Sequence, residues 1–113
     1  MVTSTDNAEH YIWGDGCDGW HLLKSGSLSV IQERMPSETR EQLHYHHKAQ
    51  QVFYILSGAA TFEVDGEVIE VKANQSLHIK PGTKHRIMNK SSEDLHFLVI
   101  SEPKAHGDRV NLD

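Results

Sequence analysis

The chain has 113 residues, of which 37% are hydrophobic, and a formal net charge of −5. This length supports one domain with a single core, and no run of about 18 apolar residues predicts a membrane-spanning helix. The negative charge includes no basic block, so neither nucleic acid nor an anionic membrane is an expected partner. The polar N-terminus lacks a signal-peptide pattern and Cys17 has no second cysteine to pair with, so we expect a cytoplasmic protein.

Residues 1–27 form a predicted N-terminal extension. Within it, Tyr11–Trp20 has the glycine-rich composition of a loop. Its two tryptophans, Trp13 and Trp20, have three alternative roles: covering a hydrophobic opening, packing on the outside of the domain, or contacting a second subunit. Leu22-Leu23 is at most a short strand.

From residue 28 onward, short segments typical of β-strands fill most of the chain. They are rich in β-branched and aromatic residues and end at turn signals such as Pro36, Gly58 and Asp65-Gly66. Apolar residues never recur at helical spacing for more than a turn or two, so the pattern favours an all-β sandwich or barrel. The predicted strands are Leu28–Met35, Gln42–His47, Gln51–Gly58, Ala59–Val64, Glu67–Val71, Ser76–Ile79, His85–Asn89 and Leu95–Ser101.

Nine histidines are an excess for this length and make a metal site worth considering. Side chains alternate along a strand, so His44 and His46 share one face and His47 points the other way. A tight connection would lay the next strand antiparallel beside the first and bring in Gln51, while His85 follows a turn far along the chain. First-row divalent metals bind neutral imidazoles, so His44, His46, Gln51 and His85 are the candidate ligands for one Zn, Fe, Mn or Ni ion.

The remaining candidates have simpler explanations. His10, His21 and His106 are expected to be solvated or packed, and His78 and His96 to be hydrogen-bonded structural residues. Cys17 has no neighbour that would activate its thiol. Phe53 and Phe97 are core residues by default, and their alternative role is the apolar wall of a substrate pocket.

The spacing of these residues resembles the cupin family, in its small single-domain form. That family's first motif runs glycine, five residues, His-x-His, three or four residues, glutamate, six residues, glycine. Its second runs glycine, five residues, proline, one residue, glycine, two residues, histidine, three residues, asparagine. The matching positions are His44, His46 and Gly58 in the first motif, and Gly82, His85 and Asn89 in the second. The resemblance covers about Leu28–Ser101 and implies a double-stranded β-helix, or jelly roll, with the barrel at 28–102 and a C-terminal tail at 103–113.

Four positions depart from the motifs. Glu38 and Asn74 stand where the motifs have glycine, and Lys80 stands where the second has proline. Gln51 replaces the glutamate, which leaves a neutral ligand set around a bound dication. Such a site should favour an anionic or enolisable ligand, although it holds the metal more weakly and lacks an internal base.

The resemblance implies a metalloprotein that binds a small oxygen-rich or anionic molecule. As an enzyme it would be a dioxygenase, or a Lewis-acid isomerase or decarboxylase. The alternatives are a non-catalytic small-molecule-binding or sensor cupin, and a degenerate cupin that matters only as a dimer partner. Because exchange or pairing of an N-terminal strand would hide a sheet edge, we expect a homodimer in which the residues before Leu28 clasp the partner.

Overall fold

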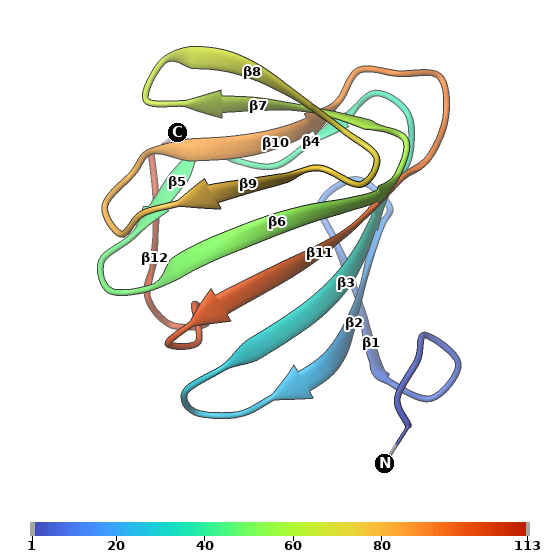
Figure 1. The fold of residues 1–113 in the computed structure, drawn as a ribbon, viewed down its shortest axis with the longest axis vertical. Helices are drawn as coiled ribbons and strands as arrows, with labels where there is room; N and C mark the ends of the chain where they lie inside the picture. The colour runs from blue at the N-terminus through green and yellow to red at the C-terminus, as the bar shows by residue number, and fades with distance from the viewer. Residues whose placement is uncertain (1, 113) are drawn as a thin grey trace.

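The computed structural model describes residues 2–112, which form two antiparallel β-sheets that face each other (Figure 1). The first sheet has the order β1 (Glu9–Trp13), β2 (Cys17–Lys24), β3 (Ser29–Met35), β11 (Leu95–Glu102), β6 (Gln50–Ser57) and β9 (Ser76–Ile79). The second has the order β12 (Arg109–Asn111), β5 (His44–His46), β10 (His85–Asn89), β7 (Ala59–Val64) and β8 (Glu67–Lys72), with β4 (Thr39–Arg40) also beside β10. No helix occurs within 2–112, and therefore none that could cross a membrane. The all-β prediction is confirmed.

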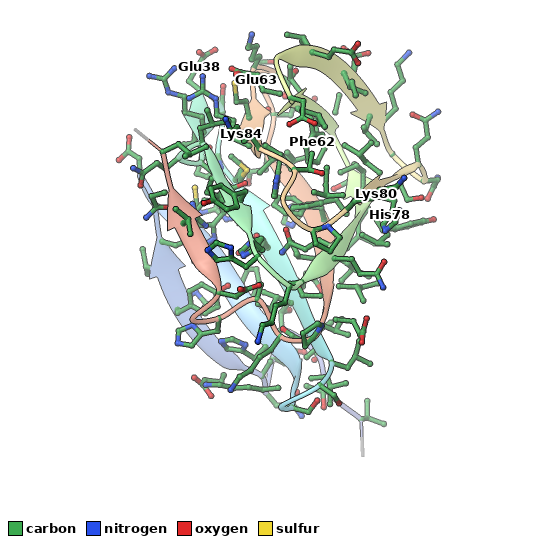
Figure 2. The ribbon with its side chains drawn as sticks, turned by 90° about the vertical axis from the view of Figure 1, so that its left-hand side faces the viewer. Glu38, Phe62, Glu63, His78, Lys80 and Lys84 are labelled. Carbon is green, nitrogen blue, oxygen red and sulfur yellow. The ribbon has the colours of Figure 1, made fainter. Side chains whose placement is uncertain are left out.

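Alternating burial along the central strands builds the core between the sheets. In β6, Phe53 and Ile55 face inward, and in β11 Leu95 and Phe97 do the same. Phe62 of the opposite sheet lies in the interior of the barrel, where its ring meets Phe53 edge-on with the centroids 5.1 Å apart (Figure 2). Burying each such side chain contributes about 1.5–3 kcal/mol, so these residues hold the two sheets together.

The loop predicted for Tyr11–Trp20 is wrong. β1 and β2 form a hairpin that joins the first sheet, because β2 pairs with β3. Gly14 and Gly16 have φ angles of 53° and 75° and make the turn, whereas Gly19 lies inside β2. These glycines therefore mark a tight turn and a special position within a strand. Leu22-Leu23, expected as a short strand, lies at the end of the longer strand β2.

The aromatic residues of the hairpin pack on the barrel itself. Trp13 lies against the hydrophobic core, and its indole Nε1 donates to the carbonyl of Asp18 at 3.1 Å. Trp20 lies beside His10 with the ring centroids 5.3 Å apart. Cys17 is fully buried, and burial raises the pKa of its thiol, as expected for an inert core cysteine.

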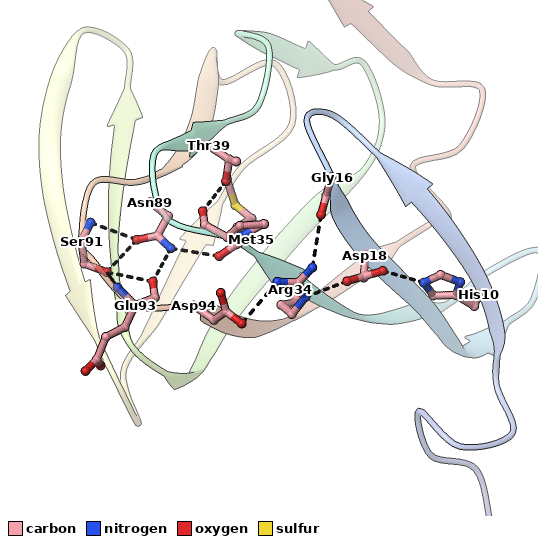
Figure 3. Close-up of polar contacts among 11 residues, drawn as sticks. His10, Gly16, Asp18, Arg34, Met35, Thr39, Asn89, Ser91, Glu93 and Asp94 are labelled. Atoms are coloured by element: carbon pink, nitrogen blue, oxygen red, sulfur yellow. Dashed lines mark hydrogen bonds and ion pairs between the residues drawn. The ribbon is translucent and has the colours of Figure 1, made fainter.

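A chain of ion pairs fastens the hairpin to the barrel (Figure 3). Asp18 accepts hydrogen bonds from His10 Nε2 at 2.8 Å and Arg34 Nε at 2.6 Å, and these two contacts lower the pKa of its carboxyl. Arg34 also donates to Asp94 at 3.2 Å and to the carbonyl of Gly16 at 3.2 Å. One guanidinium thus links β2, β3 and the loop before β11.

The predicted pairing of the His44–His46 strand with the strand that begins at Gln51 is wrong. β5 pairs with β10 and β12, while β6 pairs with β9 and β11 in the other sheet. The connection at residues 47–49 therefore crosses from one sheet to the other instead of making a hairpin. Residues 1–27 and 103–113, predicted as an extension and a tail, both supply strands to the sheets, and their outermost residues, 1 and 113, lie outside the described part.

Two of the unusual motif positions adopt the left-handed backbone that glycine favours. Glu38 has a φ of 65° and Asn74 a φ of 68°. Gly58 has a φ of 87°, and a Cβ there would lie 2.8 Å from the carbonyl oxygen of Asp94. The turns of the motifs are therefore kept although two of their glycines are replaced.

Replacing Glu38 with glycine should stabilise the protein. Its side chain is exposed, and a left-handed non-glycine residue costs about 1–2 kcal/mol, partly offset by the greater freedom of glycine in the unfolded chain. We expect Glu38→Gly to raise the free energy of unfolding by about 0.5 kcal/mol, measured by urea denaturation. Glu67→Gly, at an exposed position within β8, is the control and should lower it. A lower free energy of unfolding in Glu38→Gly would contradict the inference that the left-handed backbone at Glu38 is strained.

Candidate metal centre

Three imidazoles from β5 and β10 meet inside the barrel. His85 lies directly opposite His44 in the antiparallel pairing of these strands, and the ring centroids are 4.3 Å apart. His46, two residues along β5 on the same face, lies 5.0 Å from His44 and 5.9 Å from His85 by ring centroid. One ring nitrogen of each histidine lies within 4.8 Å of the others, and all three side chains are buried. This is the arrangement of donors that a transition metal needs.

The backbone fixes the tautomer of two of these histidines. Nδ1 of His44 lies 2.8 Å from the carbonyl oxygen of Gln42, and Nδ1 of His85 lies 2.8 Å from that of Thr83. A carbonyl oxygen only accepts, so Nδ1 carries the proton and Nε2 keeps its lone pair. In His46, Nδ1 is buried and has no hydrogen-bond partner among residues 2–112.

The loop before His85 is tied to the strand that carries the other two histidines. Gly82, with a φ of 79°, donates its backbone N–H to the carbonyl of His46 at 2.7 Å. This contact holds the turn against β5, so the positions of the imidazoles depend on main-chain hydrogen bonds as well as on side-chain packing.

Gln51 approaches the histidines from the opposite sheet. Its Nε2 donates to Ser101 Oγ at 3.0 Å, which leaves its Oε1 3.1 Å from Nε2 of His85. With the His85 proton on Nδ1, these two atoms are both acceptors and face each other across a short gap. A cation beside them would satisfy both, so the donor set fits a metal ion.

Burial keeps the three imidazoles neutral. Desolvation, with repulsion from the neighbouring His85 second, lowers the pKa of His44 to about 3 and that of His46 to about 4. Desolvation also lowers the pKa of His85. Neutral imidazole is the form that binds metals, so near neutral pH no proton has to leave before an ion enters.

His44 and His46 line one wall of a cavity of about 700 Å³. Gln51 and Phe53 line the cavity from β6, in the opposite sheet. Phe97 is not among the residues that line the cavity. It is fully buried, and its ring centroid lies 6.0 Å from that of Phe53. It is therefore a core residue, the first of the two roles considered for it. The volume suits a small organic ligand.

The other walls contain residues that the sequence interpretation missed. Glu33 and Glu41 line the cavity together with Tyr11 and Arg109. Burial raises the pKa of Glu33 to about 8, with Glu41 adding to the shift, and burial raises that of Glu41 to about 7. Alternation along β3 places Glu33 on the same face as Met35, a signal present in the sequence, whereas the loop interpretation hid Tyr11.

The other histidines divide between the cavity and the outside. His47 is exposed, as expected from strand alternation. His78 is also exposed and bonds to Gln50 at the margin of the barrel (Figure 2), so the expected hydrogen bond is present. His21 and His106 line the cavity, a position that the expectation of solvated or packed histidines did not anticipate.

Comparison with known proteins identifies the family. The model for "Cupin domain" matches residues 30–101. The chain belongs to the cupin family. It is 31% identical over 119 residues to the uncharacterized protein MJ1618 of Methanocaldococcus jannaschii, covering 100% of this chain and 95% of that one. It is 30% identical over 85 residues to the oxalate-binding protein of Thermotoga maritima, covering 71% of this chain and 70% of that one.

The solved structures agree with the fold. The polyketide cyclase RemF of Streptomyces resistomycificus superposes with a TM-score of 0.86 and 14% identity, covering 100% of this chain and 85% of that one. At that identity the similarity concerns the fold alone. The cupin jelly roll, or double-stranded β-helix, expected from the motif spacing is thereby confirmed.

In the metal-free protein His44 and His46 should stay neutral at pH 6.5, where an ordinary histidine is about half protonated, and His85 should be less protonated than an ordinary histidine. Their folded pKa values lie below the unfolded value, so the unfolded chain takes up more protons as the pH falls below about 6.5, and these residues then oppose folding. Nitrogen chemical shifts measured by NMR as a function of pH would test this. Midpoints near 6.5 for these rings would contradict it.

Proposed function

We propose that this cupin holds one divalent metal ion at His44, His46 and His85, with the amide oxygen of Gln51 as a fourth ligand. The observation that carries the proposal is the pair of facing acceptors, His85 Nε2 and Gln51 Oε1, beside two further buried imidazoles. Three protein nitrogens and one oxygen suit Zn, Fe, Mn or Ni.

We further propose that the cavity takes a small anionic or oxygen-rich molecule. The ligand set is neutral, so a bound dication would keep its whole charge for a ligand. Arg109 and Lys104 also line the cavity and add positive charge. The relative described as an oxalate-binding protein supports a small carboxylate as the first ligand to test.

When bound, the metal would supply Lewis-acid polarisation of a ligand oxygen or, as iron, manganese or nickel, redox chemistry. The chain's own residues fix the imidazole tautomers, orient the Gln51 amide through Ser101 and enclose the ligand in a partly apolar cavity. These roles suit a dioxygenase or a Lewis-acid isomerase or decarboxylase. They equally suit the alternative, a non-catalytic small-molecule-binding or sensor cupin.

Metal analysis of the purified protein tests the metal site. We expect nearly one equivalent of metal per chain and less than about a tenth of it in His44→Ala/His46→Ala, because two of four ligands are lost. The control is His47→Ala/His78→Ala, which removes two exposed histidines and should keep the metal. Unchanged metal content in His44→Ala/His46→Ala would contradict the proposal.

Ligand binding is tested by thermal melting of the zinc-loaded protein with oxalate. A ligand present at 100 times its Kd stabilises the folded state by about 2.7 kcal/mol, so a saturable rise in Tm is expected. The same addition to His44→Ala/His46→Ala should leave its Tm unchanged. Oxygen uptake by the iron- or manganese-loaded protein with a diol, flavonoid or keto acid would favour the dioxygenase, whereas a melting shift without turnover would favour the binder.

The homodimer and its clasping N-terminal residues stay a prediction. β1 is the outer strand of the first sheet and Ile12 on it is 63% exposed, so this edge is open to pairing within the described chain.

A further inference from the structure

A row of three residues crosses the first sheet on the cavity side. Tyr11 of β1 pairs with Gly19 of β2, and Gly19 pairs with Glu33 of β3. The Tyr11 hydroxyl donates to Oε2 of Glu33 at 3.0 Å. The tyrosine therefore reaches across the whole width of β2 to meet the carboxyl group.

Only glycine permits this arrangement at the middle position. A Cβ built on Gly19 would lie 2.2 Å from Cζ of Tyr11 and 2.6 Å from its hydroxyl oxygen. The ring thus occupies the space of the missing side chain. Gly19 has no positive φ, so its role is to admit the ring and not to make a turn.

Glu33 and Tyr11 line the same cavity as His44, His46 and Gln51. The charged and titratable groups around Glu33 come from several elements: Tyr11 from β1, His21 from β2, Glu41 from the segment before β5, and Arg109 from β12. Burial and the charge of Glu41 raise the pKa of Glu33 to about 8, while the bond from Tyr11 and the charge of Arg109 lower it. Burial and the charge of Glu33 raise the pKa of Tyr11, so the phenol keeps its own proton.

We propose that Glu33 is the acid–base group of this cavity and gives its carboxyl proton to the anion bound there, with Tyr11, seated over Gly19, as its positioning residue. The inference rests on the proposed function, because it needs an anion in the cavity. In the forward transfer, the O–H bond of the Glu33 carboxyl breaks as an O–H bond to a ligand oxygen forms, and the electron pair stays on the carboxylate. The reverse transfer returns the proton, and no further reactant is needed.

Glu33 would supply the proton-exchanging carboxyl group that the metal-binding motif of this chain lacks. Gln51 stands at the motif's glutamate position and cannot exchange a proton. Glu33 comes from the opposite sheet to the histidines, so it would act on a bound molecule from a different wall than the metal does. This separation lets an anion contact both.

Calorimetry of oxalate binding to the zinc-loaded protein, repeated at pH 8.5 in buffers of different ionisation enthalpy, tests the proposal. Glu33 is then mostly ionised, and binding should take up more than about half a proton per anion. Across higher pH the association constant should fall about tenfold per pH unit. Glu33→Gln should take up almost no proton and bind with a flat pH profile. The control is Glu9→Gln, which removes an exposed carboxylate from the cavity rim and should keep the wild-type uptake.

The outcomes separate the two proposals. Equal proton uptake by wild type and Glu33→Gln would assign the proton to another group, including the metal centre, and overturn this inference while the proposed function stands. Absence of oxalate binding in every variant would overturn the proposed function and this inference with it.

Tyr11→Phe tests positioning, because it keeps the ring and removes the donor to the carboxylate. The pH midpoint of oxalate binding should move upward, whereas a purely structural tyrosine would lower stability without moving that midpoint. Gly19→Ala should break the same bond, so adding Tyr11→Phe to it should cause no further movement. If Gly19→Ala does not fold, Tyr11→Phe alone tests the positioning role. An unchanged pH midpoint of oxalate binding in Tyr11→Phe would overturn that role.

Discussion

The register between β5 and β10 is the constraint on which the site depends. A single residue pair, His44 opposite His85, brings together imidazoles that lie 41 positions apart in the sequence. Because side chains alternate with a period of two, a slip of one residue would turn His85 away from the other rings. The backbone contact from Gly82 to His46 and the bonds from Nδ1 to main-chain carbonyls hold this register and the ring orientations together. The geometry of the donors is therefore a property of the main chain.

The polar groups of the cavity are divided between its walls. The histidines come from the second sheet, Gln51 faces them from the first, and the carboxyl of Glu33 lies further across the first sheet, on β3. Within the barrel, burial acts in opposite directions on the two kinds of group: it lowers the pKa of the imidazoles and raises that of the carboxyl. Both effects favour neutral forms. The imidazoles and the Glu33 carboxyl thus add little charge to that of a bound metal or anion.

The sequence predicted the part of the barrel that carries the two motifs well, and the N- and C-terminal parts of the chain poorly. Strand alternation, turn residues and the spacing from His44 to Asn89 are local signals, and they located the strands and the three imidazoles. Sheet partners are set by packing over long distances, so the pairing proposed for the strand at Gln51 was wrong although Gln51 still reached the histidines from the opposite sheet. Tyr11 was missed because glycines near it suggested a loop. That Gly19 makes room for the ring of Tyr11 becomes visible only in the folded structure.

The N-terminal hairpin is better understood as a wall of the cavity than as an appendage. It supplies Tyr11, and its second strand pairs with β3, the strand that carries Glu33. The pairing of β2 with β3 attaches the hairpin, and the ion pair between Asp18 and Arg34 adds to this attachment. This ion pair is part-buried and well aligned, so it is worth more than an ordinary surface pair. Burial raises the pKa of Glu33 and the hydrogen bond from Tyr11 of the hairpin lowers it, so the chemistry of that carboxyl is coupled to the docking of the hairpin. A segment that resembles an extension in the sequence therefore contributes to the protonation equilibrium of a carboxyl group in the cavity.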